Sequence, residues 1–196
     1  MTFHELCHGF VAYKLGDNTA KNAGRLTLNP IRHIDPMGLM MMVIFKFGWA
    51  KPVPVNMGNF KKPKRDMAIT ALAGPVSNII LAAFILLIYG FLYIPLYKLG
   101  EAGIVIMDTL VTTAYLSCAL AVFNLIPVPP LDGSKVLFSV LSEKNYYKLM
   151  RYERYGMIVL FILIAAQTFT PFLIKATQAL MTYLSVLTRF GLSFSF

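Results

Sequence analysis

A long stretch without charge, residues 67–97, limits what this chain can fold into more than any other feature. The hydrocarbon core of a bilayer is about 30 Å thick, and about 20 helical residues cross it. A second uncharged run covers residues 109–131, and a third covers residues 155–174. Residues 176–188 form a shorter apolar stretch, which suits either a short span or a helix at the membrane surface. The sequence therefore predicts an integral membrane protein that contacts the lipid bilayer through several spanning helices.

The charged residues support this interpretation by their small number and by their position. They make up 14% of the chain, whereas about a quarter of a typical soluble domain is charged. Most of the 18 Lys and Arg residues lie in two segments, 14–65 and 135–154. The positive-inside rule places such segments on the cytoplasmic side of the plasma membrane. The net charge of +9 therefore reflects topology, and no aromatic-interleaved basic stripe or recognition motif indicates nucleic-acid binding.

The expected architecture is an all-α, multi-span helical bundle that forms a single domain over residues 1–196. The segment 3–15 is predicted to be a helix, which Gly16 closes. Residues 16–65 are rich in Gly, Asn, Asp and Pro, and are expected to form a loop with a short strand around 25–28 and a re-entrant or surface-lying segment. Further elements are expected as spans at about 67–92 and 109–131 and as C-terminal helices at 155–190.

The sequence HELCH at residues 4–8 carries the pattern His-Glu-x-x-His inside an apolar stretch. On an α-helix this spacing puts His4 and His8 one turn apart on the same face, so that both imidazoles reach one metal ion. Glu5 is rotated by about 100° from His4, which places its carboxylate beside the metal, where it can take a proton from a water. Nitrogen and oxygen ligands with one open position suit zinc. The motif therefore predicts one zinc ion per chain, with Glu5 as the general base.

A zinc site of this type needs a third protein ligand, and depth in the membrane selects among the carboxylates. Helix geometry places His4 and His8 roughly 10–16 Å from the cytoplasmic edge. A helix that enters from the opposite side reaches the same depth near Asn124, where the prolines of residues 127–131 end it and predict extended backbone. Asp132 follows and can lie level with the histidines. The alternative for Asp132 is a turn residue, because Asp-Gly is a common turn pair.

Several further motifs occur together in one order along the chain. The segments are HELCHGFVAYKLGDNTAKNAGRLTLNP, HIDPMG, AKPVPVN, ALAGPVSN and FNLIPVPPLDG, and they lie between residue 3 and about residue 140. In these features the chain resembles the site-2 protease family of intramembrane zinc metalloproteases, and in particular its short members without PDZ or CBS domains. The resemblance implies that residues 1–140 form the catalytic core.

The resemblance also implies a role for each candidate residue. It maps His4, His8 and Asp132 to the zinc ion, and Glu5 to the general base and acid. It implies that Asn124 orients the substrate or stabilises the oxyanion. The expected activity is zinc-dependent hydrolysis of peptide bonds in or near the transmembrane segments of substrate proteins. Family relatives carry more apolar residues before the first motif, so we expect the natural N-terminus to lie upstream.

Two other classes of protein are compatible with parts of this pattern. A catalytically idle relative would bind transmembrane helices without cutting them, but it would not need Glu5, both histidines and Asp132 together. A transporter or ion pathway also places ionisable residues in the membrane, but it predicts paired broken helices in two halves, and the sequence shows no such duplication. His33, in a polar loop next to Asp35, is expected to have a structural role.

Overall fold

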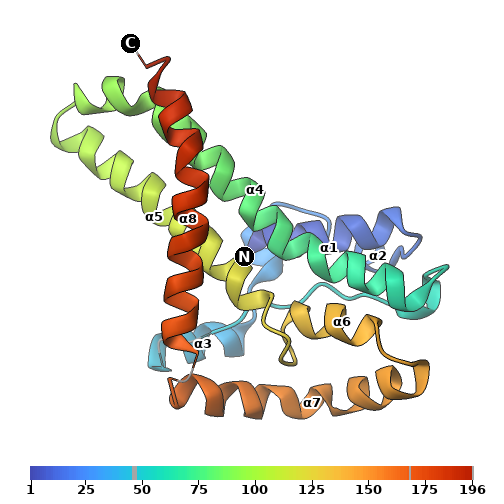
Figure 1. The fold of residues 1–196 in the computed structure, drawn as a ribbon. Coiled ribbons are helices and arrows are strands. Elements are labelled where there is room, and N and C mark those ends of the chain that lie inside the picture. The colour runs from blue at the N-terminus through green and yellow to red at the C-terminus, as the bar shows by residue number, and fades with distance from the viewer. Residues whose placement is uncertain (46–47, 168, 196) are drawn as a thin grey trace. The chain divides into compact units, whose positions relative to one another are not determined.

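The computed structural model describes residues 1–45, 48–167 and 169–195. Within these residues every regular element is a helix, as Figure 1 shows, which confirms the all-α class. The helices are α1 (Thr2–Lys14), α2 (Thr19–Asn22), α3 (Pro36–Phe45), α4 (Pro63–Tyr97), α5 (Glu101–Asn124), α6 (Asp132–Ser139), α7 (Glu143–Ala165) and α8 (Thr170–Leu192), with 3-10 helices at Pro30–His33 and Met57–Asn59.

Contacts group the chain into two compact units. The first unit comprises Met1–Ser77 and Pro127–Gly156, and the second comprises Asn78–Ile126 and Met157–Phe196. Helix α4 contributes its first part to the first unit and its remainder to the second. All three residues of the predicted metal site belong to the first unit.

The prediction of a short strand around residues 25–28 was wrong. These residues form bends and loop, and the extended pairing that the described residues contain is a single antiparallel bridge between Ile34 and Ala50. The backbone groups of the expected strand have other partners, because the Arg25 N–H donates to the Ala20 carbonyl at 2.9 Å, closing the end of α2. A strand forms only where a neighbouring strand pairs with it, and local pairing prevents that here.

Helix α1 ends at a glycine turn, and a buried carboxylate fixes the loop that follows. Gly16 has a φ of 110°, a left-handed conformation that favours glycine. Asp17 is buried and accepts hydrogen bonds from the Asn56 backbone N–H and from the Asn59 side chain, both at 2.7 Å. Burial raises the pKa of Asp17, but these hydrogen bonds and those from Thr19 outweigh burial and hold the pKa below its usual value. The ionised carboxylate therefore ties α1 to residues 56–59.

In the second unit, small side chains let three helices approach one another closely. The core consists of Ala82 and Leu86 of α4, Ala114 and Cys118 of α5, and Leu184 of α8. Small residues at helix interfaces allow close backbone approach, which is a common way for helices to associate in membranes. Cys118 is a buried free thiol that packs in this core as a small apolar residue.

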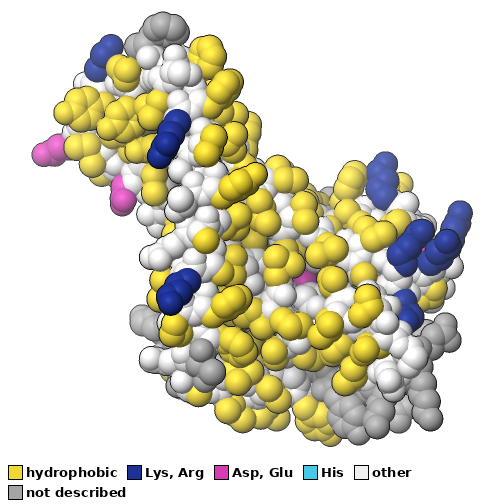
Figure 2. Space-filling view, viewed as in Figure 1, with side chains coloured by type: hydrophobic (Ala, Val, Ile, Leu, Met, Phe, Trp, Pro, Cys, Tyr) yellow, Lys and Arg dark blue, Asp and Glu magenta, His cyan; other side chains and the backbone are white. Residues whose placement is uncertain are grey.

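Helices α4 and α5 are the two described helices that are long and apolar enough to cross a membrane. At 1.5 Å per residue, α4 is about 52 Å long, which exceeds the thickness of a hydrocarbon core. Apolar side chains on both helices are exposed, among them Ile80, Phe84 and Leu116. Hydrophobic side chains cover much of the face drawn in Figure 2. Such exposure is costly in water and favourable in lipid.

The third uncharged run, 155–174, does not form one continuous helix. Helix α7 ends at Ala165 and α8 begins at Thr170. Pro171 lies in the first turn of α8, a position that proline tolerates, whereas in the interior of a helix it would remove a hydrogen bond and clash with the preceding turn. The run is therefore divided between two helices, and the shorter apolar stretch at 176–188 becomes part of α8.

Candidate metal centre and active site

Three buried side chains from two separate helices converge in the first unit. His4 and His8 lie on α1, and Asp132 is the first residue of α6. The Nε2 atoms of His4 and His8 each lie 3.1 Å from Asp132 Oδ2, and the two nitrogens are 3.0 Å apart. The possible ligand atoms of the three residues all lie within 4.8 Å of one another. Residues far apart in the sequence thus present two nitrogens and one oxygen to a common point.

The donor set fits a zinc ion. Zinc binds imidazole nitrogen and carboxylate oxygen at about 2.0–2.2 Å in tetrahedral geometry, which separates neighbouring ligand atoms by about 3.3–3.6 Å. The observed separations of 3.0–3.1 Å are only slightly shorter. Two imidazoles and a carboxylate also leave one position for water or substrate, as catalytic zinc sites require.

The orientation of His8 is fixed by the backbone of α4. His8 Nδ1 donates a hydrogen bond to the Thr70 carbonyl oxygen at 2.7 Å. A carbonyl oxygen only accepts, so Nδ1 carries the proton, and Nε2 keeps its lone pair for a metal. On the other side of the cluster, Lys135 Nζ lies 3.9 Å from Asp132 Oδ1, the oxygen that does not face the histidines. These surrounding groups orient the ligands, as they commonly do in metal sites.

The chain reaches Asp132 through turns. Leu125–Leu131 follow the end of α5, and the Leu131 N–H donates to the Val128 carbonyl at 2.9 Å. The extended backbone predicted over residues 127–131 is found at Leu131, with φ −68° and ψ 154°, whereas residues 127–130 form bends and turns. Proline fixes φ near −65°, a value that turns share with extended chain, so the prolines end α5 without producing a strand. The turns place Asp132 at the start of α6.

Glu5 lies beside the cluster and has a partner of its own. Its carboxylate oxygen Oε2 accepts a hydrogen bond from the Val53 backbone N–H at 2.9 Å. Among the described residues, no hydrogen bond is made by the other oxygen, Oε1. Glu5 is only partly buried and does not belong to the group of three clustered residues. This arrangement leaves one oxygen of a fixed carboxylate available for proton transfer.

Helix α4 also passes close to the two histidines at Gly74. A Cβ atom at this position would lie 2.6 Å from His4 Nε2 and would also collide with His8 Nε2, whereas real Cβ atoms essentially never come within 3.0 Å of another atom. The sequence motif ALAGPVSN contains this glycine, but the motif does not show that the glycine faces the metal ligands. Gly74 lies one helical turn after Thr70, so both residues are on the face of α4 that contacts His8.

We therefore expect Gly74→Ala to lower zinc affinity by about 10–100-fold, because the added methyl group must displace the histidine rings. The measurement is a competitive titration of the purified protein against a zinc chelator. Gly90→Ala is the matched control, since its Cβ also collides, with the Thr188 carbonyl oxygen of α8, but within the second unit. Equal loss of zinc in both variants would mean that Gly74 acts only through folding.

Asn124 and His33, which were considered in the sequence, and Cys7 lie outside the cluster. Asn124 is the last residue of α5, in the second unit, and its side-chain N–H donates to the Leu120 carbonyl at 2.9 Å. This hydrogen bond is local, and the role of Asn124 toward substrate stays a prediction. His33 is buried, with Nε2 2.9 Å from the Thr27 carbonyl oxygen. Cys7 is a free, partly buried thiol.

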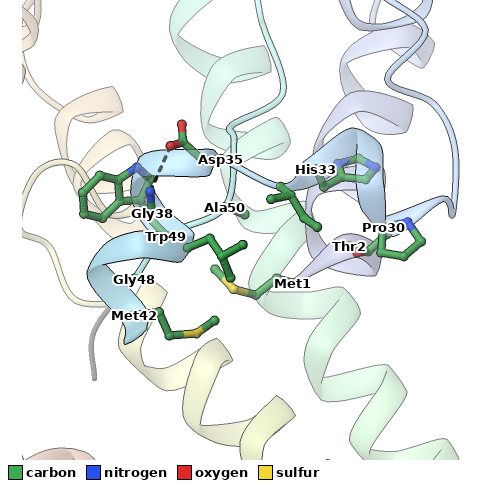
Figure 3. Close-up of a pocket in the computed structure, with 12 residues that line it drawn as sticks. Met1, Thr2, Pro30, His33, Asp35, Gly38, Met42, Gly48, Trp49 and Ala50 are labelled. Carbon is green, nitrogen blue, oxygen red and sulfur yellow. Dashed lines mark hydrogen bonds between the residues drawn. The ribbon is translucent and has the colours of Figure 1, made fainter. Parts of the chain in front are cut away.

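An open pocket of about 160 Å³ begins at the first turn of α1 (Figure 3). Met1 and Thr2 form one wall, and α3 and the segment around Trp49 form others. Most of the lining is apolar. The Glu5 backbone N–H donates to the Met1 carbonyl at 3.0 Å, so the pocket lies one helical turn from Glu5. Its size suits one large amino-acid side chain.

Comparisons with known proteins agree with this geometry. The family described as Peptidase family M50 matches residues 94–167, a stretch that contains Asp132 but not α1. A protein of Bacillus subtilis (strain 168) named "Putative zinc metalloprotease YwhC" is 43% identical over 167 residues, which cover 83% of this chain and 74% of that protein. No solved structure matches the chain.

More distant relatives carry similar names. "Putative zinc metalloprotease Rip2" of Mycolicibacterium smegmatis is 30% identical over 84% of this chain and 62% of its own length. "Putative zinc metalloprotease MJ0611" of Methanocaldococcus jannaschii is 32% identical over 69% of this chain and 63% of its own length. The chain thus spans less than two thirds of these two relatives. From its identity to the Bacillus subtilis protein over most of both sequences, the chain belongs to peptidase family M50, the site-2 protease family, as its motifs predicted.

Proposed function

We propose that this protein is a zinc-dependent endopeptidase that hydrolyses peptide bonds in or near the transmembrane segments of other membrane proteins. The observation that carries the proposal is the convergence of His4, His8 and Asp132 at separations of 3.0–3.1 Å, with the Glu5 carboxylate beside them. The names of the relatives, which describe zinc metalloproteases, support the same activity.

Each polar residue of the site has a task in this proposal. His4, His8 and Asp132 would hold one zinc ion. When bound, zinc polarises a substrate carbonyl and lowers the pKa of a bound water toward about 7. Glu5, held by Val53 through one oxygen, takes the proton of the attacking water with the other and passes it to the leaving amine. Asn124 is proposed to contact the substrate or its developing oxyanion.

The membrane setting rests on the apolar helices and on the charges. Helices α4 and α5 are proposed to span the plasma membrane, with the basic segments 14–65 and 135–154 on the cytoplasmic side. Both units together would form one multi-pass protease domain. Helix α3, whose Met42, Val43 and Ile44 are exposed, is proposed to dip into or lie on the bilayer.

A substrate helix must unwind locally before it is cut, because an intact helix holds its carbonyls in its own hydrogen bonds. The pocket beside Met1 and Trp49 is a suitable place for one apolar side chain of the unwound segment, since its lining is largely apolar. Binding of a side chain one turn from Glu5 would keep the neighbouring peptide bond near the proposed zinc site.

The experiment that tests this function compares two substrates of the purified protein in liposomes. One is a single-span peptide, and the other is a water-soluble peptide with the same sequence around the scissile bond. We expect cleavage of the spanning peptide and at least about tenfold slower cleavage of the soluble one, because only the first is concentrated at the site. Equal cleavage would refute the intramembrane preference. Binding of the spanning peptide without cleavage would favour the catalytically idle relative.

A further inference from the structure

Arg25 is a buried cation that is bound to backbone and not to a carboxylate. Its side chain is 6% exposed, and in the described part of the chain it takes part in no ion pair. Its Nη2 donates to the Lys51 carbonyl oxygen at 2.6 Å, and its Nη1 donates to the Pro52 carbonyl oxygen at 3.3 Å. Burying a guanidinium is costly unless its N–H groups are hydrogen-bonded. Because Arg25 donates to two consecutive carbonyls, we expect the position of residues 51–52 to depend on it.

His33 supports the same segment from its other side. The Lys51 N–H donates to the His33 carbonyl at 2.9 Å, next to the single bridge between Ile34 and Ala50. The ring of His33 lies between two partners, with Nε2 2.9 Å from the Thr27 carbonyl oxygen and Nδ1 3.5 Å from Arg25 Nη2. Since a carbonyl only accepts, Nε2 donates and Nδ1 is left to accept from Arg25. Residues 50–52 are therefore held by backbone and side-chain contacts.

The next residue along the chain contacts the proposed general base. The Val53 N–H donates to Glu5 Oε2 at 2.9 Å. Gly9 lies one helical turn after Glu5 on the same face of α1, and a Cβ there would lie 2.8 Å from Leu26 and 3.1 Å from Val53. The residues that follow Arg25 and those that follow Pro52 thus both pack against the face of α1 that carries Glu5.

We infer that Arg25, supported by His33, is a positioning residue for Glu5. By holding the carbonyls of Lys51 and Pro52, Arg25 sets the place and direction of the Val53 N–H, which in turn fixes the Glu5 carboxylate that takes the proton of the water. This inference rests on the proposed function of Glu5. It gives a role to two sequence segments, GRLTLNP and HIDPMG, for which the metal site has none.

A purely structural role for Arg25 makes a different prediction. A structural role would also account for a buried arginine, because its removal takes a donor from the Lys51 and Pro52 carbonyls. A structural role predicts that replacement disturbs folding, zinc binding and activity together. A positioning role predicts loss of the catalytic rate in a protein that still folds and still binds zinc.

The first test replaces Arg25 in the purified full chain. We expect Arg25→Gln to lower kcat for the spanning peptide by about 10–100-fold, as a small misplacement of a catalytic group does, with KM changed by less than about threefold and zinc content unchanged. Arg25→Lys should recover part of kcat, because an ammonium can donate to one of the carbonyls. Arg32→Gln is the matched control, since Arg32 is exposed and should be neutral.

The second test removes the hydrogen bond to Glu5 directly. Val53 lies between Pro52 and Pro54, where the backbone is already restricted to conformations that proline adopts, so Val53→Pro deletes the N–H with little backbone strain. Val53→Ala is its control, because it loses the side chain but keeps the N–H. Val53→Pro should reproduce the effect of Arg25→Gln on kcat, and the double variant should be no slower than either single variant.

Three results would overturn the positioning role. The first is a wild-type kcat in Arg25→Gln, and the second is loss of zinc from that variant. The third is a kcat in the Arg25→Gln, Val53→Pro double variant that is lowered by the product of the two single effects. A wild-type protein that binds no zinc and cleaves nothing would instead refute the proposed function itself. The two failures are therefore distinguishable.

Discussion

Replacing Glu5 with glutamine should lower kcat/KM for a membrane-spanning peptide by about 10²–10⁴-fold while the protein keeps its zinc. Glutamine has nearly the same shape, and its carbonyl oxygen can still accept the Val53 N–H, so the local structure should persist. It cannot take a proton from water. Because Glu5 lies outside the cluster of His4, His8 and Asp132, its replacement should not remove a metal ligand.

The measurement combines initial rates with zinc analysis of the same samples. Glu101→Gln provides the control, because Glu101 is an exposed acid in the first turn of α5 and should be neutral. Equal amounts of product from wild type and Glu5→Gln would remove Glu5 from the mechanism. In that case the inference about Arg25 would lose its basis as well.

Asp132→Ala should have the largest effect on the metal. The carboxylate contacts both histidines at 3.1 Å, and its removal leaves only the two imidazoles. Loss of outer hydrogen-bond partners alone lowers metal affinity about 10–100-fold, so loss of a ligand should lower zinc affinity by about 100-fold or more. Cleavage should fall in parallel when zinc is limiting, because the site would then be largely empty.

A chelator competition titration measures this affinity. Asp108→Ala is a suitable control, because Asp108 is exposed on α5 and does not belong to the cluster. Unchanged zinc affinity in Asp132→Ala would show that Asp132 is only the turn residue considered as the alternative from the sequence. It would also leave the proposed site one protein ligand short of what catalytic zinc requires.

The sequence predicted most directly the site residues that lie close together on one helix, because helical periodicity fixes their relative directions. The spacing of His4 and His8 fixes their common face on a helix, and the position of Glu5 follows from the same geometry. Asp132 required a long-range argument, because nothing local distinguishes a ligand from a turn aspartate in an Asp-Gly pair. The structure adds the 3.1 Å approach to both histidines.

The parts that sequence did not predict depend on backbone groups. The Thr70 carbonyl orients His8, and the Val53 N–H holds Glu5. Almost every residue has such backbone groups, so no side-chain pattern in the sequence marks these two. Gly74 belongs to the motif ALAGPVSN, but the motif does not show that this residue contacts the histidines. Such contacts depend on the path of distant segments, which periodicity does not encode.

The errors in secondary structure have a related cause. The strand expected at 25–28 and the extended chain expected at 127–131 were inferred from local composition. Residues 25–28 and 127–130 instead form turns, bends and loop, and only Leu131 is extended. The apolar run at 155–174 was long enough for a span, yet α7 ends inside it at Ala165 and α8 begins at Thr170. Apolar length alone does not define one helix, and a proline alone does not end one, because α4 continues through Pro75 and Pro95.

The central claim, that His4, His8 and Asp132 form a catalytic zinc centre, is tested most directly by metal reconstitution. The purified protein is stripped with a chelator, and cleavage of the spanning peptide is then measured as zinc is added back. We predict no cleavage without metal and recovery that saturates at about one zinc per chain. Full cleavage by the metal-free protein, or recovery that does not depend on zinc, would contradict the account.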